Sequence, residues 1–267
     1  MSVCIVAPYP WNAVAPLIGP DPSGFEPPGL IMCSDTLVVN GQSLEPFDFL
    51  LAKQYGLSRN LIVCYTSTYV DATMRALRRC EGTSNVKRLG NILRESHTIY
   101  GGATELLACV WTTGVQAPQI LEVMPPSYEP RPRTGIVGIG NRVVLKRFKE
   151  VFTEEIEHIL KVYVPPSVPF GSHFWIGPAI ALVTAAFSDA IEHAVEHAKR
   201  PTVGLPIHSL TITKQGYSPV QVHERSPGNP GTWRQLTTPT EKLSLLDPIA
   251  RKIPKDPTPR KACQLFD

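Results

Sequence analysis

The order of apolar segments predicts an α+β fold, in which two antiparallel sheets pack face to face and helices cover their outer sides. Short runs rich in Val, Ile and Leu come before, between and after two pairs of helical segments. Strands and helices do not alternate one for one, which argues against a doubly wound parallel sheet or a barrel of βα units. No internal repeat is visible.

The first third of the chain carries most of the strand signals. Apolar runs bounded by Gly or Asn, typical of buried strands, occupy residues 3–7, 29–33, 36–40 and 60–66. We expect GLIMCSD and TLVVNG to form one bent strand or a strand pair around Ser34 and Asp35. The proline-rich segment 8–28 is expected to be a long loop, because proline has no N–H donor and breaks both helix and sheet.

Two helical segments then separate the strands. Residues 68–81 place Val70, Met74, Leu77 and Cys80 at helical spacing, and a second helix is expected at 85–96. Strands are expected at 104–113, 119–124 and 134–140, and helices from Arg142 to about Phe152 and from Ile176 to Lys199. Strands at 206–213 and 219–223 complete the sheets.

The end of the sequence differs from the rest. Residues 225–267 show little periodicity and much proline, which predicts an extended tail. We therefore expect one folded domain, residues 1–224, with a proline-rich insertion at 8–28, followed by a tail at 225–267.

Composition favours a soluble globular protein. The 267 residues are 43% hydrophobic and 18% charged, with a formal net charge of +3, too small to predict nucleic-acid binding. The longest apolar run, residues 175–187, is shorter than the ~20 residues of a membrane span. No basic region precedes the first apolar run, unlike in a signal peptide. The six cysteines lie far apart, which favours reduced thiols, so a cytoplasmic location is expected.

Several motifs resemble the proteasome-type N-terminal nucleophile hydrolases, particularly bacterial proteasome-like proteins. They are SVCIVA at the start, GLIMCSDTLVVNG, LLAKQYGLSRNLIVCYT, GIVGIGN before a helix, and VGLPIHSLTIT after the last long helix. Their order and spacing carry the resemblance, which covers residues 2–7 and 29–213. It implies a four-layer αββα sandwich that works as an amide-bond or peptide-bond hydrolase and self-assembles by stacking into rings.

The resemblance also implies roles for individual residues. Ser2 would be the nucleophile once Met1 is removed, and its free α-amino group would be the base. Lys53 matches the family's lysine, which tunes that amine or relays its proton, and Asp35 matches the aspartate that orients the lysine. Backbone N–H groups at Tyr65 and Thr66 would bind the oxyanion. Such chemistry needs neither a metal nor an organic cofactor.

The sequence departs from the family pattern at several positions. Tyr65 or Thr66 stands where the family has a glycine, and Ile139 stands where it has a second serine. The segment KRPTVG lacks the late Asp and Ser, and there only Thr202 offers a hydroxyl. These departures leave an alternative open: a catalytically inactive subunit that keeps the fold for assembly.

Two other motifs have competing interpretations. HAVEH (193–197) matches a zinc-peptidase arrangement with two histidines on one helix face. Its surroundings instead predict an amphipathic helix without metal. GIGN (138–141) lacks the third glycine and the βαβ unit of a dinucleotide site, so we expect a tight strand-to-helix turn there.

Overall fold

The computed structural model describes residues 2–9, 29–39, 53–111, 118–163, 176–199, 201–213, 216–218, 220–225 and 233–236. Most of the predicted insertion 8–28 and most of the predicted tail 225–267 lie outside these residues. The division into a domain and a tail therefore stays a prediction.

The first sheet is built around the N-terminal strand. Its strand order is β12-β11-β9-β2-β1-β8, and β10 pairs with β9. The bounds are β1 Val3–Tyr9, β2 Gly29–Asp35, β8 Val137–Gly140, β9 Ile207–Thr213, β10 Gly216–Tyr217, β11 Gln221–Arg225 and β12 Trp233–Leu236. Every pairing is antiparallel, so consecutive side chains alternate between the two faces of the sheet.

The second sheet has the order β3-β4-β5-β6-β7, also fully antiparallel. Its strands are β3 Gln54–Ser58, β4 Leu61–Ser67, β5 Thr104–Val110, β6 Gln119–Val123 and β7 Arg131–Arg133. The chain returns to the first sheet between β7 and β8. The site described below lies where the ends of β2 and β4 come close to the starts of β1 and β3.

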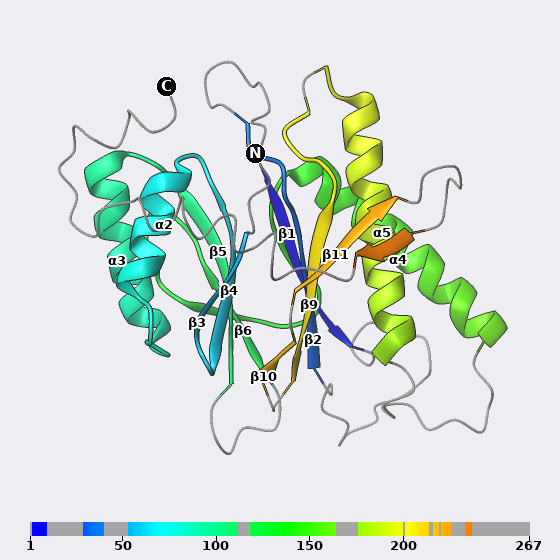
Figure 1. The fold of residues 1–267 in the computed structure, drawn as a ribbon, viewed down its shortest axis with the longest axis horizontal. Helices are drawn as coiled ribbons and strands as arrows, with labels where there is room; N and C mark the ends of the chain where they lie inside the picture. Colours follow the sequence, from blue (N-terminus) through cyan, green and yellow to red (C-terminus); the bar gives the residue numbers. More distant parts are fainter. Residues whose placement is uncertain are drawn as a thin grey trace.

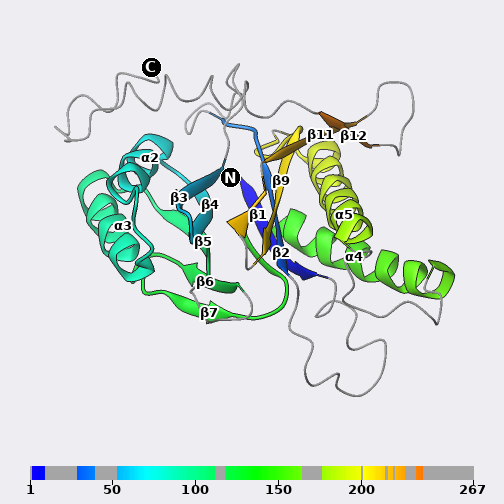
Figure 2. The ribbon, with the colours of Figure 1, turned by 60° about the horizontal axis from the view of Figure 1, so that its bottom comes forward.

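Two helix pairs cover the outer faces of the sheets. Helices α2 (Val70–Arg79) and α3 (Val86–Tyr100) lie on the second sheet, and α4 (Arg142–Tyr163) and α5 (Ile176–His197) lie on the first (Figure 1). The rotated view shows the same succession of helices, sheet, sheet and helices (Figure 2).

Three apolar clusters hold these layers together. Phe148 and Phe187 join α4 and α5 to Ile5 and Ile31 of the first sheet. A second cluster joins Leu77 and Leu89 of α2 and α3 to the second sheet. A third, including Met32, Ile62 and Leu107, fills the space between the sheets. The prediction of an α+β fold with two antiparallel sheets is thus confirmed, and the described residues form a layered sandwich.

Several predicted boundaries need correction. The described part of the strand predicted at 36–40 does not form it: β2 ends at Asp35, and of residues 36–39 only Val39 makes an isolated bridge. The chain leaves the sheet there because Thr36 donates its hydroxyl to the Pro206 carbonyl and Leu37 offers its carbonyl to Lys53. Helix α4 extends beyond the expected Phe152 to Tyr163. Strand β12, inside the predicted tail, pairs with β11.

Candidate active site

Asp35 and Lys53 form a buried ion pair at the end of the sandwich. Lys53 Nζ lies 2.8 Å from Asp35 Oδ1, and the side chains are 2% and 0% exposed. The local folding brings them together: β2 ends at Asp35, and Lys53 directly precedes β3 in the other sheet. Lys53 is therefore not the solvated lysine that an isolated position in the sequence would suggest.

Among the described residues, the Lys53 ammonium has two hydrogen-bond partners. An ammonium carries three N–H donors. Of these, one goes to Asp35 and one to the Leu37 carbonyl at 2.7 Å. Burial raises the pKa of Asp35 above its ordinary value, while the Lys53 charge and the Val3 N–H act in the opposite direction. Both donors thus bind Asp35 Oδ1, while the buried Oδ2 has no hydrogen-bond partner among the described residues.

Ser2 is held at this pair by its backbone. The Val3 N–H donates to Asp35 Oδ1 at 2.9 Å, and the Asn141 N–H donates to the Ser2 carbonyl at 2.9 Å. Gly140, with φ +91°, lies so close that an added Cβ would be 1.9 Å from the Ser2 oxygen. The GIGN segment is therefore the predicted tight turn, and its second glycine allows β8 to contact the first residue of the described chain.

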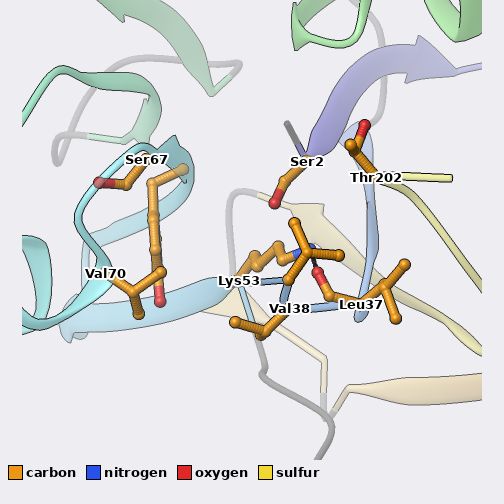
Figure 3. Close-up of a pocket in the computed structure, with 9 residues that line it drawn as sticks. Ser2, Leu37, Val38, Lys53, Ser67, Val70 and Thr202 are labelled. Atoms are coloured by element: carbon orange, nitrogen blue, oxygen red, sulfur yellow. Dashed lines mark hydrogen bonds between the residues drawn. The ribbon is translucent and has the colours of Figure 1, made fainter. Parts of the chain in front are cut away.

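A small pocket opens beside Ser2. It has a volume of about 40 Å³ and is lined by Ser2, Leu37, Val38, Val39, Lys53, Tyr65, Ser67, Val70 and Thr202. Figure 3 shows the Ser2 hydroxyl directed towards Lys53, with Thr202 on the same side and Ser67 and Val70 across the pocket. Ser2, Lys53 and Asp35, separate in the sequence, thus meet in one place.

The predicted oxyanion donors are placed differently from the expectation. The Tyr65 N–H, expected to bind the oxyanion, donates to the Lys53 carbonyl at 3.0 Å. Successive N–H groups of a strand point to opposite sides, so the Thr66 N–H faces β5. The Ser67 N–H then points to the same side as that of Tyr65, beyond Lys53. Both predicted amides thus belong to the sheet.

Ser67 is a pocket residue that the sequence reasoning missed. Its hydroxyl accepts hydrogen bonds from the Tyr69 N–H at 2.9 Å and from Thr73 Oγ1 at 2.8 Å. The signal that could have found it is its position: it ends β4 immediately before helix α2. A serine two residues before the N-cap can accept from the backbone amide of that residue, here Tyr69.

The remaining expected support positions differ in character. Ile139 is fully buried between the sheets, and Val203 is buried under the helices of the first sheet. Neither provides a polar group. Thr202, the predicted substitute, does line the pocket.

The HAVEH motif lies on α5 away from this pocket. The His193 and His197 rings are 4.2 Å apart, and His197 Nδ1 is 2.8 Å from the His193 carbonyl. Within the described residues, no group of three His, Cys, Asp or Glu side chains is placed to hold a metal ion. All five described cysteines are buried and unpaired. None of the described helices is both long enough and apolar enough to cross a membrane.

Comparison with known proteins gives a match in structure only. No protein-family model matches the chain, and neither does any curated protein. Among solved structures, the chain is similar to the Gly-1 mutant of Anbu from Hyphomicrobium sp. strain MC1, with a TM-score of 0.51 and 14% identity. The match covers 100% of this chain and 98% of that one. At this identity the likeness concerns the fold alone, that is, the arrangement of the two sheets and their helices.

Proposed function

We propose that this chain is a proteasome-like N-terminal nucleophile hydrolase that cleaves amide or peptide bonds through Ser2. Removal of Met1 would expose the α-amino group of Ser2 beside its own hydroxyl. The unperturbed pKa of such an amine, near 7.7–8.0, suits a base at neutral pH, and a neighbouring cation lowers it further. The third N–H of Lys53, which has no partner among the described residues, would serve this role.

The proposed reaction has two stages. The α-amino group takes the hydroxyl proton as Ser2 Oγ attacks the carbonyl carbon of the scissile amide. The resulting tetrahedral intermediate expels the amine, which receives the proton from the α-ammonium group, and an ester with Ser2 remains. Water then attacks the ester with the same amine as base, which releases the acid and restores Ser2.

The oxyanion would be bound by Ser67 rather than by Tyr65 or Thr66. Strand alternation predicts that the Ser67 N–H points to the same side of β4 as the Tyr65 N–H, which donates to the Lys53 carbonyl. The Ser67 hydroxyl bonds to Tyr69 and Thr73 fix the backbone of the turn before α2. A preorganised N–H donor of this kind stabilises the negative charge of the intermediate.

One observation carries the proposal: among the described residues that line the pocket of Ser2, the cation Lys53 is buried. Its carboxylate partner Asp35 also accepts a hydrogen bond from the backbone amide of Val3. The test is mass spectrometry of the mature N-terminus together with hydrolysis of a peptide library by the wild type and by Ser2→Ala. We expect Met1 to be absent and Ser2→Ala to abolish turnover. Retention of Met1 in a protein that still hydrolyses peptides would exclude the free-amine mechanism.

A second candidate is a structural subunit that has kept the sandwich and lost the chemistry. The buried, apolar Ile139 and Val203 favour it, because support groups for the amine were expected there. In both cases we propose self-assembly through the helical layers. Ser2→Ala separates the candidates, since only the hydrolase loses a measurable activity, while sedimentation should show the same assembly for both proteins.

A further inference from the structure

Besides Asp35 Oδ2, three buried polar atoms near Lys53 have no hydrogen-bond partner among the described residues. They are Ser34 Oγ on β2, Gln54 Oε1 on β3 and His208 Nδ1 on β9. Their residues are 0%, 6% and 5% exposed, so bulk water does not reach them. Such atoms are normally satisfied by protein or by internal water, because leaving them unpaired is costly.

The register of the strands brings the three side chains together. Ser34 and His208 are direct partners in the β2/β9 ladder and therefore share a face. Strand alternation puts them on the same face as Met32 and Leu210, which belong to the cluster between the sheets. Gln54 reaches this place from the other sheet, since its Nε2 donates to the Met32 and His208 carbonyls at 3.2 and 3.1 Å.

This polar group interrupts an otherwise apolar layer. The neighbouring inter-sheet side chains include Leu30, Met32, Ile62 and Leu107. Gln54 directly follows Lys53 in the sequence. Burial is the main cause of the lowered pKa of His208, and the Lys53 charge lowers it further. The cluster thus lies beside the buried ion pair.

The donors and acceptors of Ser34, Gln54 and His208 indicate which molecule the cluster can bind. Burial lowers the pKa of His208 to about 4, so its ring is neutral at pH 7 and Nδ1 can accept or donate according to the tautomer. Ser34 can do both, and Gln54 Oε1 accepts. These three side chains carry no net charge, so they offer no anionic ligand to a cation. The nearby Lys53 ammonium would also repel a bound cation. An internal water, which both donates and accepts, fits this set.

We propose that Ser34, Gln54 and His208 form a built hydration site that holds ordered water between the two sheets, next to Lys53. One water can donate to Gln54 Oε1 and to His208 Nδ1 while it accepts from the Ser34 hydroxyl. The site joins β3 of the second sheet to β2 and β9 of the first through the water and the Gln54 amide. It does not depend on whether Ser2 is a nucleophile.

The test is a crystal structure of the full chain at a resolution that shows ordered water, together with oxygen-17 relaxation dispersion in solution. We expect a water within hydrogen-bond distance of at least two of the three atoms. His208→Leu should remove at least one long-lived water from the dispersion signal, and Ser34→Ala should shorten its residence. Because Ser34→Ala removes only one hydroxyl, this variant still tests the proposal if His208→Leu does not fold.

The matched control is His223→Leu on β11. His223 is also buried with a pKa lowered to about 4, but its Nε2 already pairs with Ser209 Oγ at 2.7 Å. This variant should retain the water count of the wild type. A dry cluster, a bound ion in it, or equal loss of water in the His208 and His223 variants would each overturn the proposal.

Discussion

Gly140 lies directly against the carbonyl oxygen of Ser2. The contact is so close that the shape of the β8 turn and the position of Ser2 are set together: Asn141 donates its N–H to the same oxygen, and the Gly140 N–H donates to Glu105 Oε2 at 2.7 Å. Gly140 thus packs against the backbone of Ser2, the proposed nucleophile. Glu105 of the second sheet fixes Gly140 by accepting its N–H.

Substitution of Gly140 by alanine should be severe. The backbone at φ +91° is strained for any side chain, and the Cβ would be 1.9 Å from the Ser2 oxygen. We expect the free energy of unfolding to fall by about 3 kcal/mol or more, measured by urea titration. Gly135→Ala is the control, because Gly135 also has a positive φ, +70°, but its Cβ would meet nothing within 4 Å. There we expect a loss of about 1 kcal/mol. Equal losses in the two variants would contradict the contact.

The Lys53–Asp35 pair should show strong coupling in a double-mutant cycle. Lys53→Met or Asp35→Asn alone leaves one buried group without its partner, which costs about 3–5 kcal/mol. The double variant should be less destabilised than the sum of the two by about 2 kcal/mol or more, because no charge stays unpaired. The exposed pair Arg94–Glu129, with side chains 44% and 52% exposed, is the control. Its coupling should stay below about 1 kcal/mol, and a similar value for the buried pair would refute the prediction.

Much of the fold could be predicted from the sequence because its signals are local. The runs at 3–7 and 29–33 contain mainly apolar residues and became strands buried on both faces. The strand expected at 36–40 failed for a non-local reason, since Thr36 and Leu37 have partners at Pro206 and Lys53 that no local pattern reveals. The short edge strand β7, Arg131–Arg133, resembled a turn because its three residues are exposed and include a proline.

The candidate site was only partly predictable. The family resemblance indicated Ser2, Asp35 and Lys53, and these residues do converge in the structure, although their catalytic roles stay proposals. The oxyanion prediction depended on the register of β4, and a two-residue difference separates Tyr65 from Ser67. Strand register is fixed by long-range pairing, so a motif without coordinates could not decide which amide points towards the pocket.

Stability should fall as the pH is lowered from about 6.5 to 4. Burial lowers the pKa of His208 and of His223 to about 4, so the unfolded chain, with histidines near 6.5, binds more protons in this interval. Each histidine should therefore lower the free energy of unfolding by roughly 2–3 kcal/mol between pH 7 and pH 4. The raised pKa of Asp35 has the opposite sign, because its stabilising contribution is present at low pH and declines as the pH rises.

The measurement is the free energy of unfolding across this pH range for the wild type and for His223→Gln. The variant should lose at least half of the histidine-dependent slope, because His223 titrates itself and also contributes to the lowered pKa of His208. A slope that is the same in both proteins would show that His223 does not carry a lowered pKa.

Ser67→Ala should separate the geometry of the pocket from the stability of the fold. The change removes the acceptor of the Tyr69 N–H and of the Thr73 hydroxyl, and so loosens the backbone that is proposed to bind the oxyanion. We expect turnover to fall by on the order of tenfold with KM nearly constant, because a transition-state interaction is weakened. The free energy of unfolding should drop by only about 1 kcal/mol.

Ser58→Ala provides the matched control for Ser67→Ala. Ser58 Oγ accepts from the Asn60 N–H two residues later at 3.3 Å, the same kind of local bond, but Ser58 does not line the pocket. This variant should lose a comparable amount of stability and keep its turnover. If both variants lose turnover equally, the effect of Ser67 is a general loosening of the fold. If only Ser67→Ala does so, the turn before α2 acts on the reaction through the pocket.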